Sequence, residues 1–235
     1  MERLERAFKH LNVNVSRETL DKFETYMNRV LEWNEKVNLT AITDREEFVV
    51  KHFVDSVLCV NIEKYKGAKT VIDVGTGAGF PGIPLALISP EKEFLLMDSL
   101  NKRIKILEEI KTELGLNNVS LLHGRAEEVA KNKLYREKFD VCVSRAVARV
   151  SVLSEYCLPF IKVGGALLAY KGTDYEREMK EGERAVKILG GKYGETCSAS
   201  IPDFDFEHRI VCIEKIKSTP AAYPRKAGTP AKEPL

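Results

Sequence analysis

Glycine residues gather directly after a short, apolar and β-branched run of the sequence. The run ends in Asp73, and Gly75, Gly77, Gly79 and Gly82 follow closely. Glycine lets the backbone turn sharply and approach a ligand, because a Cβ atom would collide in either role. A strand that leads through such a loop into a helical stretch is typical of a nucleotide-like ligand site. The spacing therefore predicts a bound nucleotide or nucleoside cofactor.

One class of cofactor that fits this loop is a dinucleotide. Gly77, Gly79 and Gly82 satisfy the G-x-G-x-x-G fingerprint, and Asp98 ends the next predicted strand. A nicotinamide or flavin nucleotide is therefore one alternative. A purely structural turn is another.

Two features favour S-adenosylmethionine (SAM) instead. Asp73 stands two residues before Gly75, which gives a D-x-G-x-G-x-G arrangement whose acidic group can hold the positively charged methionine portion of SAM. Phe80 and Pro81 interrupt the start of the helix that would receive a pyrophosphate on its amides. Because SAM has no phosphate, it does not need that helix start. We therefore expect SAM as the cofactor, with Asp73, Gly75, Gly77 and Phe80 at its site.

Two later segments complete the predicted cofactor site. Asp98, at a strand end, suits a carboxylate that accepts hydrogen bonds from ribose hydroxyls, although it could also cap the helix that begins near Asn101. Ala126 and Glu127 follow the third strand, where an adenine ring would lie and backbone groups could read its edge. An ordinary turn between strand and helix is the alternative for this pair.

The elements that must position these residues alternate between strands and helices from Lys69 onward. This alternation predicts an α/β fold with a doubly wound, Rossmann-like sheet of the SAM-dependent methyltransferase type. The expected strands are 70–74, 93–98, 119–123, 140–144, 165–171, 191–199 and 207–216. The expected helices between them are 82–87, 102–114, 126–131, 152–160 and 173–189, the last with a capping box of Thr173 and Glu176.

The chain divides into three predicted parts. Residues 1–66 show helical periodicity and form an N-terminal extension packed on the core, with a capping box of Thr43 and Glu46 before one of its helices. Residues 67–217 form the SAM-binding core. Residues 218–235 form a basic C-terminal tail that is poor in regular structure.

Composition bounds the class of protein. The net charge of +2 does not by itself indicate a nucleic-acid partner, so any RNA contact must be local. The N-terminus lacks an apolar signal segment and no apolar run could span a membrane, which predicts a cytoplasmic protein without a membrane partner. The five cysteines show no metal-like spacing, which predicts reduced, mostly buried thiols and no metal site.

An ordered set of motifs covers nearly the whole chain. The motifs are Trp33-Asn-Glu-Lys-Val-Asn38-Leu-Thr-Ala-Ile, His52-Phe-Val-Asp55-Ser56, the loop from Asp73 to Gly82, Ser144-Arg145-Ala146, Lys171-Gly172 and the tail from Arg225 to Leu235. In this order they resemble the ribosomal RNA small subunit methyltransferase G family, formerly called glucose-inhibited division protein B. The tail departs from the family's R-x-P-G by having Ala227 before Gly228.

The resemblance implies an activity, a substrate and site residues. It implies a SAM-dependent enzyme that methylates N7 of a guanine in the 530 loop of 16S rRNA. We expect the partner to be 16S rRNA, in the 30S subunit or its assembly intermediate, and the enzyme to be a monomer. It places Gly75, Phe80, Ala126, Glu127 and Arg145 beside the cofactor.

Arg145 is the expected catalytic residue, because its planar fork could bind guanine O6 or a phosphate. An arginine paired with a carboxylate at the sheet edge is the alternative. Lys171, Arg225, Lys226 and Lys232 are the candidate contacts to rRNA phosphates.

Guanine N7 carries a lone pair at neutral pH, so no general base is expected. This agrees with the lack of a catalytic motif of the amino-group or cytosine C5 methyltransferases. Two rival functions stay open: a SAM-dependent methyltransferase acting on a small molecule or a protein, and a ribosome-assembly factor that binds SAM and rRNA without methyl transfer.

Overall fold

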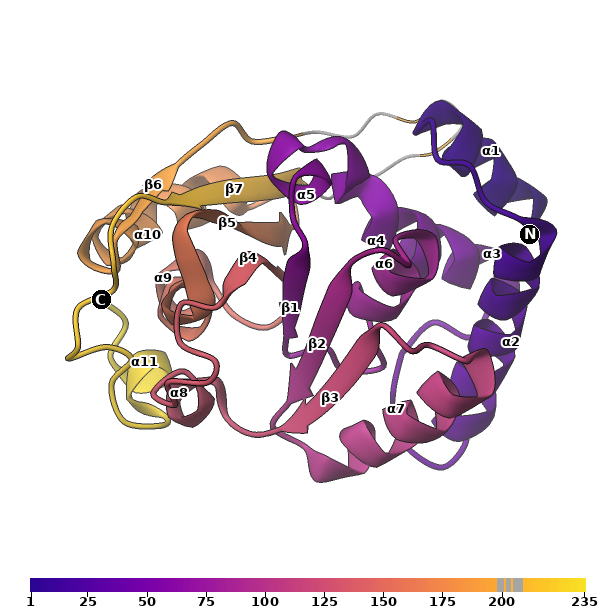
Figure 1. Cartoon of the computed structure of the whole chain (residues 1–235), viewed down its shortest axis with the longest axis horizontal. Coiled ribbons are helices and arrows are strands. Elements are labelled where there is room, and N and C mark those ends of the chain that lie inside the picture. Colours follow the sequence, from indigo (N-terminus) through magenta and orange to yellow (C-terminus); the bar gives the residue numbers. More distant parts are fainter. Residues whose placement is uncertain (198–200, 202–203, 205–208) are drawn as a thin grey trace.

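A seven-stranded sheet crosses the centre of the molecule with helices on both faces (Figure 1). The computed structural model describes residues 1–197, 201, 204 and 209–235. The strand order is β3-β2-β1-β4-β5-β7-β6, with β1 to β5 parallel and β7 antiparallel to both of its neighbours. The strands are β1 (Thr70–Val74), β2 (Glu93–Asp98), β3 (Val119–His123), β4 (Phe139–Arg145), β5 (Ile161–Lys171), β6 (Gly191–Tyr193) and β7 (Arg209–Lys215). The predicted doubly wound α/β fold is confirmed.

The helices of the N-terminal part precede the sheet in sequence, and the others alternate with its strands. The first group is α1 (Glu2–His10), α2 (Arg17–Asn34), α3 (Arg45–Phe48), the π-helical turn Val49–Val54, α4 (Asp55–Val57), the 3-10 turn Leu58–Asn61 and α5 (Glu63–Lys66). The second group is α6 (Gly82–Ile88), α7 (Asn101–Leu114), α8 (Ala126–Val129), α9 (Val150–Cys157), the 3-10 turn Leu158–Phe160, α10 (Tyr175–Ile188) and α11 (Thr229–Lys232).

Alternating side chains of the strands pack into two apolar cores, one on each face of the sheet. On β1, Val71 joins the core that contains α1, α2, α6 and α7, whereas Ile72 joins the core with α8, α9 and α10. Strands buried on both faces read as continuous apolar runs, which is the pattern that β1 and β5 show. The N-terminal helices therefore share one core with the sheet, although the predicted division of the chain at residues 66 and 217 stays a prediction.

Both predicted capping boxes were wrong in position. Asp44 caps α3 by accepting a hydrogen bond from the Glu47 amide at 2.8 Å, so Thr43 lies one residue too early. Asp174 is the N-cap of α10 and makes no side-chain cap bond. Capping depends on the backbone angles of the cap residue, which a short sequence pattern does not specify.

The C-terminal end of the chain differs from its prediction as well. The expected strand 191–199 is only three residues long in β6, and residues 198–199 and 207–208 of the two expected strands lie outside the described residues. The tail is poor in regular structure, as predicted, with the short α11 near its end. It is nevertheless held in place, because Arg136 donates hydrogen bonds to the Thr219 and Tyr223 carbonyls at 2.8 and 2.9 Å. These bonds attach the tail to the loop before β4.

The cysteines agree with the prediction of reduced thiols. All five are free, and four of them are buried while Cys197 is partly exposed. Among the helices of the described residues, none combines the length and the apolar character that crossing a membrane requires.

The start of β4 is tied to β1 by a carboxylate that offers a test of this sheet. Asp140 accepts hydrogen bonds from the Thr70 amide at 2.9 Å and the Lys69 amide at 3.0 Å, and it pairs with Lys162. Burial acts to raise the pKa of Asp140, but these amide donors and Lys162 outweigh it and lower the pKa to about 2.

We expect Asp140→Asn to lower the free energy of unfolding at pH 7 by about 1 kcal/mol, a value discounted for partial exposure of the carboxylate. Because the folded-state pKa lies below the ordinary value, this stabilisation exists above pH 4 and is lost as the pH falls towards 2. Urea unfolding of both proteins at neutral and acidic pH measures the difference. A difference that does not depend on pH would contradict this account.

Candidate active site

A pocket of about 150 Å³ opens at the carboxyl ends of β1, β2 and β3. Ligands of open α/β sheets bind at this edge. The pocket brings together four of the predicted cofactor residues, and its full lining is Val74, Gly75, Met97, Asp98, Ser99, Gly124, Arg125, Ala126, Glu127, Val147, Tyr156 and Gly228.

Asp73 lies beneath the glycine loop and holds its shape. It is fully buried, and its Oδ2 accepts hydrogen bonds from Thr76 Oγ1 at 2.7 Å and from the Gly82 amide at 2.9 Å. Burial raises the pKa of Asp73 to about 7. Its Oδ1 is buried and has no hydrogen-bond partner within the described part of the chain. A buried carboxyl oxygen without a partner is costly. Asp73 is not among the residues that line the pocket.

Asp98 binds the loop from the other side. Its Oδ2 accepts from the Gly77 amide at 3.0 Å and pairs with Arg103 at 3.3 Å, and its Oδ1 accepts from the Leu100 amide at 2.9 Å. The cap residue of α7 is Leu100, so the alternative that Asp98 itself is the N-cap is wrong. Asp98 therefore lines the pocket and also holds the Gly77 backbone in place through its amide.

Phe80 is buried against the N-terminal helices rather than against the pocket. The His52 ring stacks on it at a centroid distance of 4.4 Å and an interplanar angle of 9°. Phe48 and Tyr26 contact the same ring at 5.7 and 5.3 Å, and the Tyr26 hydroxyl donates to the Ala78 carbonyl at 2.7 Å. The cofactor loop thus takes its position partly from residues far upstream.

A larger cleft of about 820 Å³ adjoins the cofactor pocket, and Val147 lines both. Arg145, the last residue of β4, lies on its wall with His52 and Asp55, and Lys171 lies at the end of β5. The chain turns away directly after Arg145, where Ala146 has φ of 56°. A non-glycine residue in this left-handed region costs of the order of 1 kcal/mol and often marks a functional site.

Arg145 is paired with a carboxylate, as the alternative interpretation of this residue stated. Its Nη1 donates to Asp55 Oδ2 at 2.7 Å and to the Lys51 carbonyl at 2.9 Å, and its Nη2 donates to His52 Nδ1 at 3.1 Å. The guanidinium carbon also lies 5.2 Å from the centre of the Phe80 ring. The Arg145 side chain is 10% exposed and that of Asp55 is 1% exposed.

Two of the four predicted phosphate contacts have internal partners instead. Lys171 is buried and donates to the Ala148 carbonyl and to Glu178. Arg225 makes a bidentate contact to the buried carboxylate of Glu155, with its Nη2 2.7 Å from Oε2. Both side chains are therefore committed to holding the protein together, and neither stands free for a phosphate in this structure.

The other two candidates, Lys226 and Lys232, are exposed on the tail. Between them, the Gly228 amide donates to Glu127 Oε1 at 2.8 Å. This bond brings the tail to the rim of the cofactor pocket, where the sequence did not place it.

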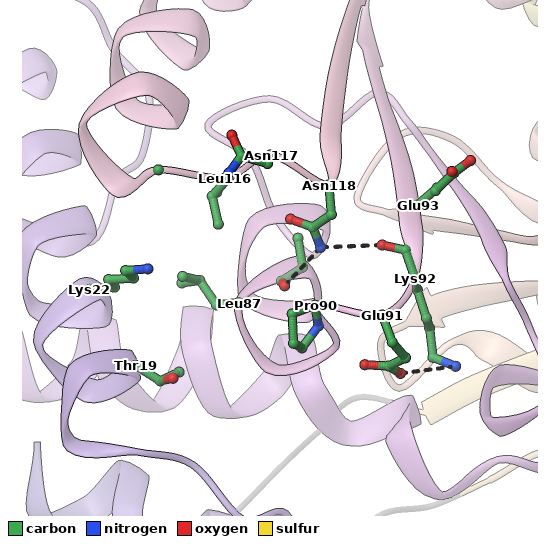
Figure 2. Close-up of a pocket in the computed structure, with 12 residues that line it drawn as sticks. Thr19, Lys22, Leu87, Pro90, Glu91, Lys92, Glu93, Leu116, Asn117 and Asn118 are labelled. Carbon is green, nitrogen blue, oxygen red and sulfur yellow. Dashed lines mark hydrogen bonds and ion pairs between the residues drawn. The ribbon is translucent and has the colours of Figure 1, made fainter.

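A third cavity, of about 590 Å³, lies at the amino ends of the strands (Figure 2). Figure 2 shows Asn118, before β3, donating to the Lys92 carbonyl, and Glu91 and Lys92 beside it. Glu93 begins β2, so this cavity is at the amino ends of the strands, away from the glycine loop. It contains none of the predicted site residues.

Sequence reasoning missed the partners of Arg145. The motif that contains His52 and Asp55 was recognised but was given no role. Their spacing of three residues on a helical segment puts both side chains on one face, which is the signal that could have found them.

The doubly wound sheet, the acidic residue at the end of β1 and the glycine loop above the strand ends define this protein as a SAM-dependent methyltransferase. Solved structures share the fold. The O-methyltransferase from Bacillus cereus in complex with SAH has a TM-score of 0.56 and 15% identity, covering 81% of this chain and 91% of its own. A putative O-methyltransferase from Klebsiella pneumoniae has a TM-score of 0.54 and 14% identity, covering 87% and 92%.

Sequence comparisons show the family. The family model of rRNA small subunit methyltransferase G matches residues 19–203. The ribosomal RNA small subunit methyltransferase G of Clostridium tetani is 48% identical over 99% of this chain and 97% of its own, and that of Alkaliphilus metalliredigens is 48% identical over 96% and 94%. The chain belongs to the rRNA small subunit methyltransferase G family, as its motifs predicted.

Gly82 offers a test of the loop. A Cβ atom at this position would lie 2.8 Å from Asp73 Oδ2 and 2.7 Å from Leu96 Cγ, so Gly82→Ala must disturb the contact that closes the loop. We expect SAM affinity to fall by at least about 10-fold, because losing one buried hydrogen bond that shapes the loop costs about 1.4 kcal/mol or more of binding free energy. Calorimetric titration with SAM measures this loss. Gly67→Ala is the control, because its Cβ meets only ordinary contacts, and equal affinity of the two variants would refute the role of the loop.

Proposed function

We propose that this protein transfers the methyl group of SAM to N7 of a guanine in the 530 loop of 16S rRNA. The observation that carries the proposal is the meeting of two cavities at Val147, a small pocket at the glycine loop and a larger cleft walled by Arg145. Membership of the rRNA small subunit methyltransferase G family supports the substrate. We further propose that the protein acts as a monomer in the cytoplasm, on the 30S subunit or its assembly intermediate.

The proposed cofactor contacts combine residues that line the pocket with residues of the glycine loop around it. Asp73 would hold the ammonium group of the methionine portion, because its Oδ1 is buried and lacks a partner within the described residues. Asp98 would accept hydrogen bonds from the ribose hydroxyls, and backbone groups of Ala126 and Glu127 would border the adenine. Gly75 and Gly77 keep the backbone close to the ligand, and Phe80 supports the loop from behind.

The chemistry that SAM supplies when bound is an electrophilic methyl group on a sulfonium. Guanine N7 needs no proton removed before it attacks, so this chain has to align the base and exclude competing water rather than provide a base. The carboxylates that line the cleft agree with this: Asp55 pairs with Arg145, and Glu178 pairs with Lys171. Holding two reactants in line can lower a barrier by several kcal/mol, about 7 or more in favourable cases.

In this proposal Arg145 donates hydrogen bonds to guanine O6 alone, and not to the O6 and N7 pair that an arginine fork engages in bidentate contacts. Such a contact fixes the base by its edge while N7 stays available for methylation. Lys226 and Lys232 are the proposed phosphate contacts, because both are exposed beside the cofactor pocket. Lys171 and Arg225 remain secondary candidates, since a phosphate would have to displace Glu178 or Glu155.

The experiment that tests the function is nucleoside mapping by mass spectrometry. The protein and SAM are incubated with 30S subunits from a strain that lacks this methyltransferase, with naked 16S rRNA in a parallel reaction. A new 7-methylguanosine in the 530 loop supports the proposal. Binding of SAM without any methyl transfer to RNA would refute it and favour the assembly-factor function, whereas transfer to a small molecule or a protein alone would favour the other rival.

Arg145 gives the first variant to test. We expect Arg145→Ala to lower kcat by at least about 100-fold, because the base would no longer be held in line, with SAM affinity reduced less than about 5-fold. Methyl incorporation from labelled SAM and calorimetry measure the two quantities. Arg177→Ala, which breaks exposed pairs with Asp174 and Glu181, is the matched control. Turnover of Arg145→Ala at the control's rate would exclude a catalytic role.

A further inference from the structure

The N-terminal part of the chain supplies every polar partner that the described residues give to Arg145. Asp55 Oδ2 and the Lys51 carbonyl accept from Nη1, and His52 Nδ1 accepts from Nη2. Arg145 belongs to β4 and is 90 residues away from Asp55 in sequence. The residue with the proposed catalytic role is therefore held by a segment outside the methyltransferase sheet.

The hydrogen bonds of His52 have a defined direction. An arginine side chain only donates, so Nδ1 must accept and the imidazole must be neutral with its proton on Nε2. That proton is donated to Thr40 Oγ1 at 2.7 Å, which also accepts from the Ile42 amide at 3.1 Å. Burial first, and then the charge of Arg145, lower the pKa of His52 to about 3, so the ring stays neutral at physiological pH.

The backbone around these residues is irregular in a way that serves Arg145. His52 lies in the π-helical turn Val49–Val54, and the Asp55 amide donates to the carbonyls of Val50 and His52. In a regular α-helix that amide would bind the Lys51 carbonyl, which here accepts from Arg145 instead. π-Helical turns within α-helices are frequent at functional sites.

The loop before this turn is held as well. The Asn34 side chain, at the end of α2, accepts hydrogen bonds from the amides of Leu39 at 2.7 Å and Thr40 at 2.9 Å. Thr40 is therefore fixed by its backbone while its hydroxyl oxygen receives the His52 proton. This explains in physical terms why the two N-terminal motifs of the family occur together in this chain.

The contacts leave part of the guanidinium available to a ligand. A guanidinium has five N–H groups. The hydrogen bonds to Asp55, Lys51 and His52 use both N–H groups of Nη1 and one N–H group of Nη2. Within the residues that the structure describes, Nε and the second N–H of Nη2 have no acceptor. Arg145 lines the 820 Å³ cleft, so these two donors can serve an acceptor oxygen of a ligand there.

We propose that Asp55, His52 and Thr40 are positioning residues that orient the Arg145 guanidinium towards the substrate cleft, so that the N-terminal segment completes the active site. The inference rests on the proposed role of Arg145 in methyl transfer. His52 also stacks on Phe80, so the same side chain holds the guanidinium and supports the cofactor loop. Cofactor and substrate are thereby aligned by one cluster.

Two substitutions at His52 separate positioning from packing. Asparagine and leucine have similar shapes and both lose the stack on Phe80, but only asparagine keeps an acceptor near the place of Nδ1. We expect His52→Leu to lower kcat by at least about 10-fold, while His52→Asn stays within about 3-fold of wild type, since small misplacements of a catalytic group are costly. Thr40→Val, which removes only the hydroxyl, should lower kcat in the same direction by a smaller factor.

The measurements are kcat and KM for 30S subunits at saturating SAM, SAM affinity by calorimetry, and the folded fraction by circular dichroism. Positioning predicts a loss in kcat with SAM affinity within about 3-fold of wild type. Asp55→Asn should reduce kcat at least as much as His52→Leu. Asp140→Asn is its matched control. It removes a paired carboxylate at the amino end of β4, away from the cleft, and should leave kcat unchanged.

The outcomes distinguish this inference from the proposed function. If Arg145→Ala is inactive while His52→Leu and Thr40→Val turn over at the wild-type rate, Arg145 acts without these partners and the inference is wrong. Equal kcat losses in His52→Asn and His52→Leu would also overturn it, since packing alone would then account for both. Full activity of Arg145→Ala would instead refute the role of Arg145 itself. If Asp55→Asn fails to fold, the kcat values of His52→Asn, His52→Leu and Thr40→Val still test the inference.

Discussion

The packing of Phe80 against the N-terminal helices is the contact on which the arrangement of the site depends. Phe80 belongs to the glycine loop, and its ring meets His52, Phe48, Tyr26 and Phe53. Aromatic contacts of this kind bury large apolar areas, and each pair adds about 1 kcal/mol beyond burial. The loop that approaches the cofactor and the segment that reaches Arg145 are therefore parts of one apolar core, and neither can move far without the other.

Buried charges in this region stabilise the fold less than their close distances suggest. Removing a paired arginine and carboxylate from water costs several kcal/mol per ion, and apolar residues of similar size are often as stable. Arg145 with Asp55 is a pair of this kind, and both residues line the larger cleft. Asp73 is a different case: it is a buried acid whose Oδ1 has no hydrogen-bond partner within the described residues. Neither group is explained by a gain in stability alone.

The C-terminal tail contributes to the same site from the other face of the sheet. Arg225 pairs with buried Glu155 on α9, and the Gly228 amide donates to Glu127 at the cofactor pocket. In Figure 1 the yellow α11 lies next to α8, which carries Glu127. Residues within 42–55 of the N-terminal part line the cleft, and Gly228 of the tail lines the pocket, so segments before and after the central part complete both cavities.

The sequence by itself determined the local elements and the class of cofactor site. The bounds of β1, β2 and β3, the glycine loop and the place of Asp98 all follow from patterns within a few residues, because periodicity and turn chemistry act over that range. Only the tertiary structure decided the partners of the charged residues. Asp55 and Arg145 meet across 90 residues, and Glu155 and Arg225 across 70. Such pairings depend on how the sheet brings distant strand ends and helices together. A local sequence pattern does not specify these long-range contacts.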